Sequence, residues 1–297
     1  MKNLLIALDG SKQSESVLPI ALVIASRCDY QPVLLSVWET GPEEPPDAAR
    51  PQIVELTDRG TEYMRAYLHG LAPLLDQVGV TMTVEIRAGH PAIEIISAAQ
   101  DREADMIAIC THGRRAVPGD RRGSVADKVL RGSPVPVLAV GPRTALAEPS
   151  QPVRIRRILV PLDGSPEAEE ALPLAIDLAH GLHSEIDLLR VVTPVAGHYA
   201  QELPGGYERE IGRHREKVAR RYLDDVRGRH KDQVISTHTA SGFASATIAD
   251  FIERSHIDLV VMTSHSRYAA GLWTLGGVAD SVIDGPVPVV LVRPATA

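Results

Sequence analysis

The sequence predicts two doubly wound α/β domains in tandem, each built on a parallel β-sheet. The first observation is a repeat: Leu-Asp-Gly-Ser follows an apolar run at residues 8–11 and again at 162–165. The second is an alternation of short apolar runs with helical patterns, which is typical of buried parallel strands joined by helices. The third is Pro-Val-Pro-Val near each half's end, at 134–137 and 286–289. The offset of about 153 residues is a domain length, not a solenoid repeat.

The elements of the first half follow from apolar spacing and from helix breakers. Residues 3–8 are strand formers, and the spacing of Val17, Ile20 and Ile24 predicts a helix. Gly79 ends a long amphipathic pattern, and the Pro-rich stretch 42–51 predicts a loop. In order, we expect a strand at 3–8, a helix at 14–27, a strand at 32–38, a helix at 53–78, a strand at 81–87, a helix at 90–102, a strand at 106–110, a helix at 124–131 and a strand at 135–140.

The second half repeats this order. Its predicted strands are 155–162, 185–192, 234–239, 259–263 and 287–292, and its predicted helices are 166–182, 208–229, 244–254 and 278–283. Prolines and small residues near 146–153 predict a linker. The expected domains are therefore 1–145 and 154–297.

Composition restricts the function. Acidic residues (38) exceed basic ones (31), and both halves share this balance, so nucleic-acid binding is not expected. Two cysteines without a CxxC motif favour the reducing cytoplasm. No signal peptide and no apolar stretch long enough for a membrane span is predicted.

The segment from Gly113 to Ser124 is a candidate anion site. A glycine follows a strand, four arginines lie in the following loop, and Gly123-Ser124 opens a helix, whose free N–H groups favour an anion. The arginines are Arg114, Arg115, Arg121 and Arg122. The alternative is a helix that Ser124 caps, with Asp127 completing a capping box. No P-loop lysine and no GxGxxG motif is present.

Asp9 and Asp163 each end the first strand of a half. Such an aspartate can bind a base, a ribose or a metal-bridged phosphate. It can equally be a turn residue that helps to start the next helix. Ser165 and Pro166 fit the second interpretation, as N-cap and first helical residue.

Taken together, these residues resemble the universal stress protein family in its tandem form. The family's signature runs Gly, two residues, Gly, nine residues, Gly and then Ser or Thr. The first half has Cys110, Gly113, Gly123 and Ser124 at this spacing, so three of four positions match. Asp9 matches the family's first-strand aspartate, and the valine after the second strand is Val37.

The resemblance implies a five-stranded sheet in each half, in the order 3-2-1-4-5 with helices on both faces, and ATP binding at the strand tips. It implies that Asp9 and Val37 hold the adenosine, and that Gly113, Gly123, Ser124 and Val125 hold the phosphates. ATP, with or without Mg²⁺, is the expected cofactor. Pairing through the last strand is also implied, either between the two halves as an intramolecular pseudo-dimer or in a homodimer.

The second half departs from the signature. Thr263 and Ser266 replace the first two glycines, Gly277 replaces the Ser or Thr, and only Gly276 matches. Asp163 and Val191 remain as counterparts of the adenosine residues. We therefore expect one good polyphosphate site, in the first half, and either a reduced site or an empty partner domain in the second.

The leading hypothesis is a cytoplasmic stress-response protein in which ATP is a regulatory ligand. A slow ATPase is a second hypothesis, for which His112 and His265 are candidate bases, although no catalytic set can be assembled from spacing alone. A nucleotide-free interaction or metal-binding module is the third. His180 and His183, at i and i+3, favour it weakly because no third ligand is evident.

Overall fold

The computed structural model describes residues 1–39, 50–77, 79–113, 122–144, 153–194, 207–264 and 275–294. Within them the chain divides into two compact units, Met1–Arg154 and Ile155–Ala297, here called the first and second domains. Each domain is described by itself.

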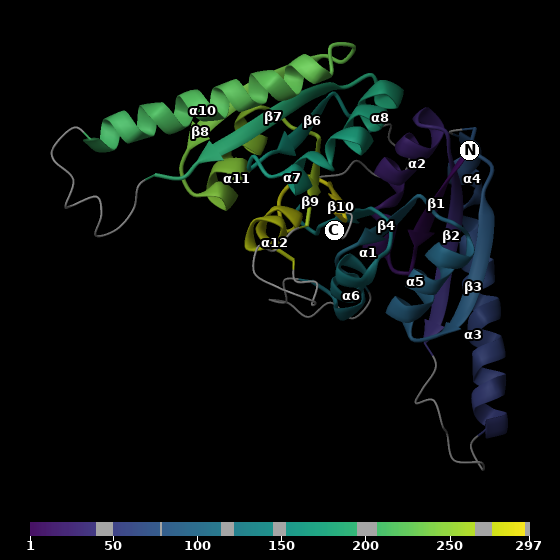
Figure 1. Cartoon of the computed structure of the whole chain (residues 1–297). Helices are drawn as coiled ribbons and strands as arrows, with labels where there is room; N and C mark the ends of the chain where they lie inside the picture. The colour runs from purple at the N-terminus through teal and green to yellow at the C-terminus, as the bar shows by residue number, and fades with distance from the viewer. Residues whose placement is uncertain are drawn as a thin grey trace. The chain divides into compact units, whose positions relative to one another are not determined.

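The first domain alternates strands with helices (Figure 1). Its strands are β1 (Lys2–Ala7), β2 (Tyr30–Glu39), β3 (Thr83–Gly89), β4 (Met106–Cys110) and β5 (Val137–Val140). Its helices are α1 (Lys12–Glu15), α2 (Leu18–Arg27), α3 (Arg50–Gly70), α4 (Ala72–Gln77), α5 (Pro91–Asp101) and α6 (Ser124–Gly132).

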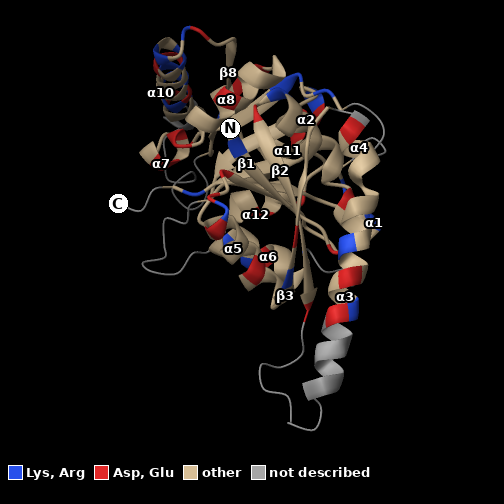
Figure 2. Cartoon of the chain, turned by 90° about the vertical axis from the view of Figure 1, so that its right-hand side faces the viewer, with Lys and Arg blue, Asp and Glu red and all other residues tan. Residues whose placement is uncertain are grey.

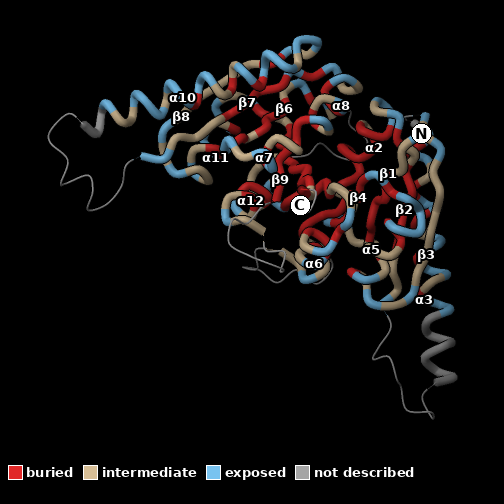
Figure 3. The backbone as a smooth tube through the Cα atoms, in the orientation of Figure 1, coloured by how far each residue is buried: buried red, intermediate tan, exposed pale blue. Residues whose placement is uncertain are grey.

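The sheet of the first domain is parallel throughout, in the order β3-β2-β1-β4-β5. In the central strand, Leu4 lies opposite Met106 of β4, and Leu5 lies opposite Val33 of β2. Leu4, Leu5 and Ile6 are fully buried, so both faces of the sheet are covered, as Figure 3 shows for the central strands. The predicted fold class and strand order are confirmed for this domain.

The second domain has the same arrangement, in the order β10-β9-β6-β7-β8 and with parallel pairs throughout. Its strands are β6 (Arg157–Pro161), β7 (Glu185–Val192), β8 (Ile235–Ser241), β9 (Leu259–Thr263) and β10 (Val289–Val292). Its helices are α7 (Pro166–Glu169), α8 (Leu172–Leu182), α10 (Tyr207–Arg229), α11 (Ala244–Arg254) and α12 (Gly277–Ile283). No helix in the described part of the chain is long and apolar enough to cross a membrane.

Three helices that the sequence predicts as continuous are each broken in two. The breaks separate α1 from α2, α3 from α4, and α7 from α8. Pro19, Pro73 and Pro173 each lie at the second residue of the restarting helix. Proline has no N–H to donate to the carbonyl four residues earlier, so the helix stops and restarts there. The continuous helices predicted at 14–27, 53–78 and 166–182 were therefore wrong in this detail.

Gly60 lies inside α3 because Trp38 occupies the space where a side chain would be. A Cβ built on Gly60 would overlap the indole ring of Trp38, which follows Val37 near the end of β2. We expect Gly60→Ala to lower the free energy of unfolding by about 1–3 kcal/mol through overpacking. This reverses the usual gain of roughly 1 kcal/mol when alanine replaces glycine in a helix.

Thermal and urea unfolding will measure this effect. The matched control is Gly212→Ala in α10, where nothing lies within 4 Å of the added Cβ. This control substitution should stabilise the protein. A stabilising effect of Gly60→Ala as well would contradict the packing of Trp38 against α3.

Candidate functional site

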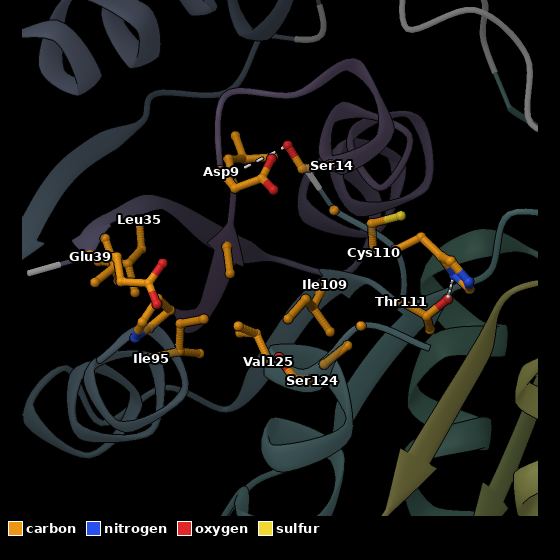
Figure 4. A pocket seen from close by; sticks show the side chains of 18 of the residues that line it. Asp9, Ser14, Leu35, Glu39, Ile95, Ile109, Cys110, Thr111, Ser124 and Val125 are labelled. Atoms are coloured by element: carbon orange, nitrogen blue, oxygen red, sulfur yellow. Dashed lines mark hydrogen bonds between the residues drawn. The ribbon is translucent and has the colours of Figure 1, made fainter. Parts of the chain in front are cut away.

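The carboxyl ends of β1, β2 and β4 border a cavity of about 360 Å³ (Figure 4). This is within the usual range for small-molecule sites. All six site residues predicted in the first half line it, namely Asp9, Val37, Gly113, Gly123, Ser124 and Val125. The topology explains this convergence, because parallel strands end at the same edge of the sheet.

Asp9 holds the turn that follows β1. Its Oδ1 accepts hydrogen bonds from the N–H of Ser11 at 2.9 Å and from the hydroxyl of Ser11 at 2.6 Å. Ser11 in turn caps α1 by accepting from the N–H of Ser14 at 3.1 Å. Asp9 is thus a turn residue as well as a cavity residue, and the two interpretations left open by the sequence are compatible.

The second carboxylate oxygen of Asp9 lies against Gly113. A Cβ built on Gly113 would be 2.5 Å from Oδ2 of Asp9, far inside van der Waals contact. A side chain at position 113 would therefore displace the Asp9 carboxylate from the tip of β4. The resemblance assigned Gly113 to the phosphates, and the sequence gave no sign of this contact with Asp9.

The start of α6 faces the cavity. Gly123 is its N-cap, with extended backbone and no side-chain hydrogen bond, and its N–H donates to the carbonyl of Thr111 at 2.8 Å. The expectation that Ser124 caps this helix was wrong: Ser124 is its first residue. The bond from Gly123 to the buried β4 tip fixes the start of the helix one residue earlier. The first N–H groups of a helix have no intrahelical acceptor, and those of Ser124 and Val125 belong to residues that line the cavity.

One side of the cavity is mainly apolar but includes the Glu39 carboxylate, and the other side is more polar. Figure 4 shows Leu35, Ile95 and Glu39 on one side, and Cys110 and Thr111 on the other. Val37, Ile109 and Val125 add apolar surface, while His112 and Arg122 add polar groups. An apolar slot beside a glycine-rich helix start suits a ligand with a flat apolar part and an anionic part.

Cys110 stands where the family signature has glycine. Its side chain is 7% exposed and lines the cavity, and its Sγ accepts a hydrogen bond from the Ser16 hydroxyl at 3.3 Å. Burial raises the pKa of the Cys110 thiol above its ordinary value, despite the opposing effect of Ser16. The thiol is therefore protonated at neutral pH and contributes shape rather than nucleophilic reactivity.

Two further polar contacts involve residues of α1, α3 and the tip of β4. The hydroxyl of Tyr67 in α3 donates to Oε1 of Glu15 in α1 at 3.0 Å, and burial, with the Glu15 carboxylate, raises the pKa of Tyr67. This contact ties α3 to the helix that follows Asp9. His112, a candidate base, lines the cavity with Nδ1 3.0 Å from Oγ1 of Thr111.

Several predicted residues lie outside the described residues. They are Arg114, Arg115, Arg121, His265 and Ser266. Of the four loop arginines, Arg122 is described, and it lines the cavity.

In the second domain, the counterparts lie at the ends of equivalent elements. Asp163 follows β6 and accepts from the N–H and hydroxyl of Ser165, at 2.9 and 2.6 Å, as Asp9 does from Ser11. Ser165 caps α7 and Pro166 begins it, as predicted. Val191 lies near the end of β7, Gly276 is the N-cap of α12, and Gly277 is that helix's first residue.

One feature of the second domain has no equivalent in the first. Arg190 stands at the β7 position that Ser36 occupies in β2. Its guanidinium packs directly over Gly164 and lies 4.8 Å from the centroid of the Tyr222 ring. The backbone turn after Asp163 is therefore covered on one side by a cation.

The sequence missed several cavity residues. They are Ser14, Leu35, Trp38, Glu39, Met64, His90, Pro91 and Ile95. Leu35, Trp38 and Glu39 could have been found from their position at the tip of the second strand, and His90-Pro91 from its place between a strand and a helix. Met64 comes from α3, and nothing in its local sequence indicates that it reaches the site.

The histidine pair of the metal hypothesis lies at the end of α8. His183 ends that helix in the left-handed conformation, three residues after His180. Within the described residues, no group of three or more His, Cys, Asp or Glu side chains is placed to hold a metal ion.

Comparison with known proteins gives consistent results. The model of the universal stress protein family matches residues 1–141 and again 154–293. A universal stress protein of Methanocaldococcus jannaschii is 29% identical over 142 residues, which are 47% of this chain and 81% of that protein. One from Mycolicibacterium smegmatis is 30% identical over 139 residues, 47% of this chain and 45% of that protein. The crystal structure of a universal stress protein from Archaeoglobus fulgidus superposes with a TM-score of 0.70 at 22% identity, covering 99% of this chain and 98% of that one. With two matches that together span nearly all of its length, this chain belongs to the universal stress protein family.

Proposed function

We propose that the first domain binds an adenine nucleotide, ATP in the first instance, as a regulatory ligand of a stress-response protein. The observation that carries the proposal is the start of α6, a helix without a side-chain cap, where Gly123, Ser124 and Val125 all border the cavity. Helix N–H groups without acceptors, together with the helix dipole, favour phosphate at this position.

The other parts of the cavity support the same ligand. Val37, Leu35 and Ile95 offer an apolar slot for a purine, and Asp9 offers acceptor oxygens near a ribose. Arg122 brings one cation to the polar side. We propose that Asp9 and Val37 contact the adenosine, and that Gly113, Gly123, Ser124 and Val125 surround the phosphates.

In the second domain we propose at most weak binding. Asp163 and Val191 keep their places, and Gly276 and Gly277 open α12 as Gly123 and Ser124 open α6. However, Gly277 has no hydroxyl to donate to a phosphate, and α12 is shorter than α6. One nucleotide for each chain is therefore the expected stoichiometry.

Calorimetric titration of the full chain with ATP, with and without Mg²⁺, tests the proposal. A Cβ at position 123 would be 3.5 Å from its nearest neighbour, the Thr111 carbonyl, so Gly123→Ala should fold normally. It should nevertheless weaken ATP binding by about ten- to a hundredfold, because the phosphate loses charge-assisted bonds worth about 1.5–3 kcal/mol.

The matched control is Gly276→Ala, at the aligned position of the second domain, which should leave the titration unchanged. Equal affinity in the wild type and in Gly123→Ala would contradict the assigned site. Absence of saturable binding to the wild type would contradict the function itself. The same samples, followed for phosphate release in wild type and His112→Ala, decide whether ATP is also hydrolysed.

A further inference from the structure

A shallow groove of about 490 Å³ lies between α3 and β3 of the first domain, and it is lined by Arg65, His69, Met82, Thr83, Val84 and Ile86. Figures 1 and 2 show α3 lying alongside β3. β3 ends the strand order of this sheet, and the strand paired with it is β2. We call this feature the β3 groove.

Among the described residues, β3 pairs with a strand on one side only, so its other edge faces the groove without a paired strand. An edge strand presents a row of N–H and C=O groups that can pair with another strand, and proteins usually protect such edges with charged side chains, proline or a bulge. Met82, Val84 and Ile86 alternate along the chain here and line the groove with apolar surface, half-buried at each position. On the face that lines the groove, β3 itself therefore carries no charged side chain.

The charged residues of β3 are used elsewhere. Glu85 accepts from Nε of Arg87 and from Nε of Arg102, both at 2.6 Å. Arg87 also donates to Asp101 at 2.8 Å. Alternation along a strand places these side chains on the face opposite Val84 and Ile86. They stabilise the packing of α5 and do not guard the groove.

The guanidinium of Arg65 and the imidazole of His69, both on α3, border the groove without internal partners. Arg65 and His69 are both exposed, and neither forms an ion pair or a hydrogen bond within the described part of the chain. An exposed arginine over an open strand edge is a recognition element for a carboxylate, which it can hold with two parallel hydrogen bonds.

In the second domain, the residues at the aligned positions have partners within the domain. Tyr67 and Tyr222 are equivalent, so Arg65 aligns with Arg220 and His69 with Asp224. Arg220 pairs with Glu216 at 3.3 Å, and Asp224 pairs with Arg227 at 3.0 Å. Asp224 also accepts from the hydroxyl of Thr237 in β8 at 3.4 Å. Arg220 and Asp224 thus have partners within the second domain, whereas Arg65 and His69 have none within the described part of the first domain.

The spacing of Arg65 and His69 on α3 fits an extended chain. Residues i and i+4 of a helix are separated by about 6 Å along its axis. Side chains i and i+2 on one face of a strand are separated by about 6.6 Å. A strand that pairs with the edge of β3 would therefore place alternate side chains opposite Arg65 and His69.

We propose that the β3 groove docks an extended peptide segment of a partner protein by strand addition, and that this segment carries carboxylates at alternate positions. Main-chain hydrogen bonds to β3 supply affinity. The Arg65 guanidinium selects acidic side chains over basic ones, and the His69 ring can donate an N–H to a second carboxylate. The groove is not part of the nucleotide cavity, so this inference stands apart from the proposed function.

Fluorescence anisotropy with the full chain tests the proposal. The probe is a short, capped and labelled peptide in which glutamate alternates with threonine. We expect saturable binding that Arg65→Glu weakens at least about tenfold, since reversal of one charge replaces attraction by repulsion. Arg220→Glu, at the aligned and internally paired position, should bind the probe as the wild type does.

Two further probes separate strand addition from simple charge attraction. A peptide with lysine in place of glutamate should not bind, and a glutamate peptide N-methylated at alternate amides should lose binding because its main chain cannot pair. Hydrogen exchange should show slower exchange of β3 amides when the unmodified probe is bound.

The proposal is overturned if no saturable binding is seen, or if Arg65→Glu or N-methylation leaves the affinity unchanged. Equal weakening by Arg65→Glu and Arg220→Glu would also overturn it, because it would indicate a general effect of charge. Arg65→Glu should leave both the unfolding transition and the ATP titration as in the wild type, which excludes misfolding as the cause of lost binding.

Discussion

Replacing Asp187 with asparagine will lower the free energy of unfolding of the second domain by about 3–5 kcal/mol. Asp187 lies in β7 and is 1% exposed. Its carboxylate accepts from Nε and Nη2 of Arg157 at 2.9 and 2.7 Å, and lies 2.8 Å from Nε2 of His238. Removing this charge leaves the Arg157 guanidinium partly buried beside a neutral amide, which is the costly way to break a buried ion pair.

Hydrogen exchange at the amides of β7 is the measurement of choice, because it reports on unfolding of the second domain independently of unfolding of the first. The control is Asp127→Asn in α6, which breaks the Asp127–Arg131 pair. Those side chains are 36% and 37% exposed, so Asp127→Asn should lower the free energy of unfolding by less than about 1 kcal/mol. An effect of Asp187→Asn no larger than that of the control would show that the network does not stabilise the domain.

A compensating variant sharpens this test. The first half has Asn3 and Val33 where the second has Arg157 and Asp187. Combining Arg157→Asn with Asp187→Val should recover part of the stability lost in Asp187→Asn, because no cation is then left without its partner.

This network also illustrates what sequence can and cannot predict. Leu4, Leu5 and Ile6 predict a buried strand because a strand covered on both faces is apolar at every position. Asp187 interrupts such a run, and its partners come from β6 and β8, 30 and 51 residues away in the chain. Local pattern carries no information on contacts over such separations, so the pairing of Asp187 could not be predicted.

In the candidate site too, some features could be predicted from the sequence and others depend on contacts between distant segments. Asp9, Gly113 and Gly123 were found because they lie at strand tips or at a helix start, which topology brings to one edge of the sheet. Val37 was identified only by the resemblance to the family. The alternative in which Ser124 caps the helix was wrong: serine is a preferred N-cap residue, but Gly123 is the N-cap and donates a tertiary hydrogen bond to Thr111. The reason for glycine at 113 likewise depends on the Asp9 side chain, which only the folded structure brings near.

That contact leads to the second large expected effect: Gly113→Ser will weaken ATP binding by at least about a hundredfold. The variant introduces the residue found at the aligned position 266 of the second half. Its Cβ would be 2.5 Å from Oδ2 of Asp9, and β4 cannot move away because β1 and β5 pair with it on both sides. Asp9 must therefore turn out of its place, which removes the proposed adenosine contact and weakens the turn at Ser11.

A double-mutant cycle distinguishes this mechanism from a direct clash with the phosphate. If Gly113→Ser acts through Asp9, it should add little to the loss caused by Asp9→Ala, because each change removes the same carboxylate from the site. If the serine instead blocks the phosphate, the two losses should add. Calorimetric titration of the four proteins with ATP gives the coupling energy, and additivity within about 0.5 kcal/mol would reject the role of the Asp9–Gly113 contact. Strong coupling would in turn explain why a half with serine at this position is expected to bind nucleotide poorly even though its own aspartate, Asp163, is kept.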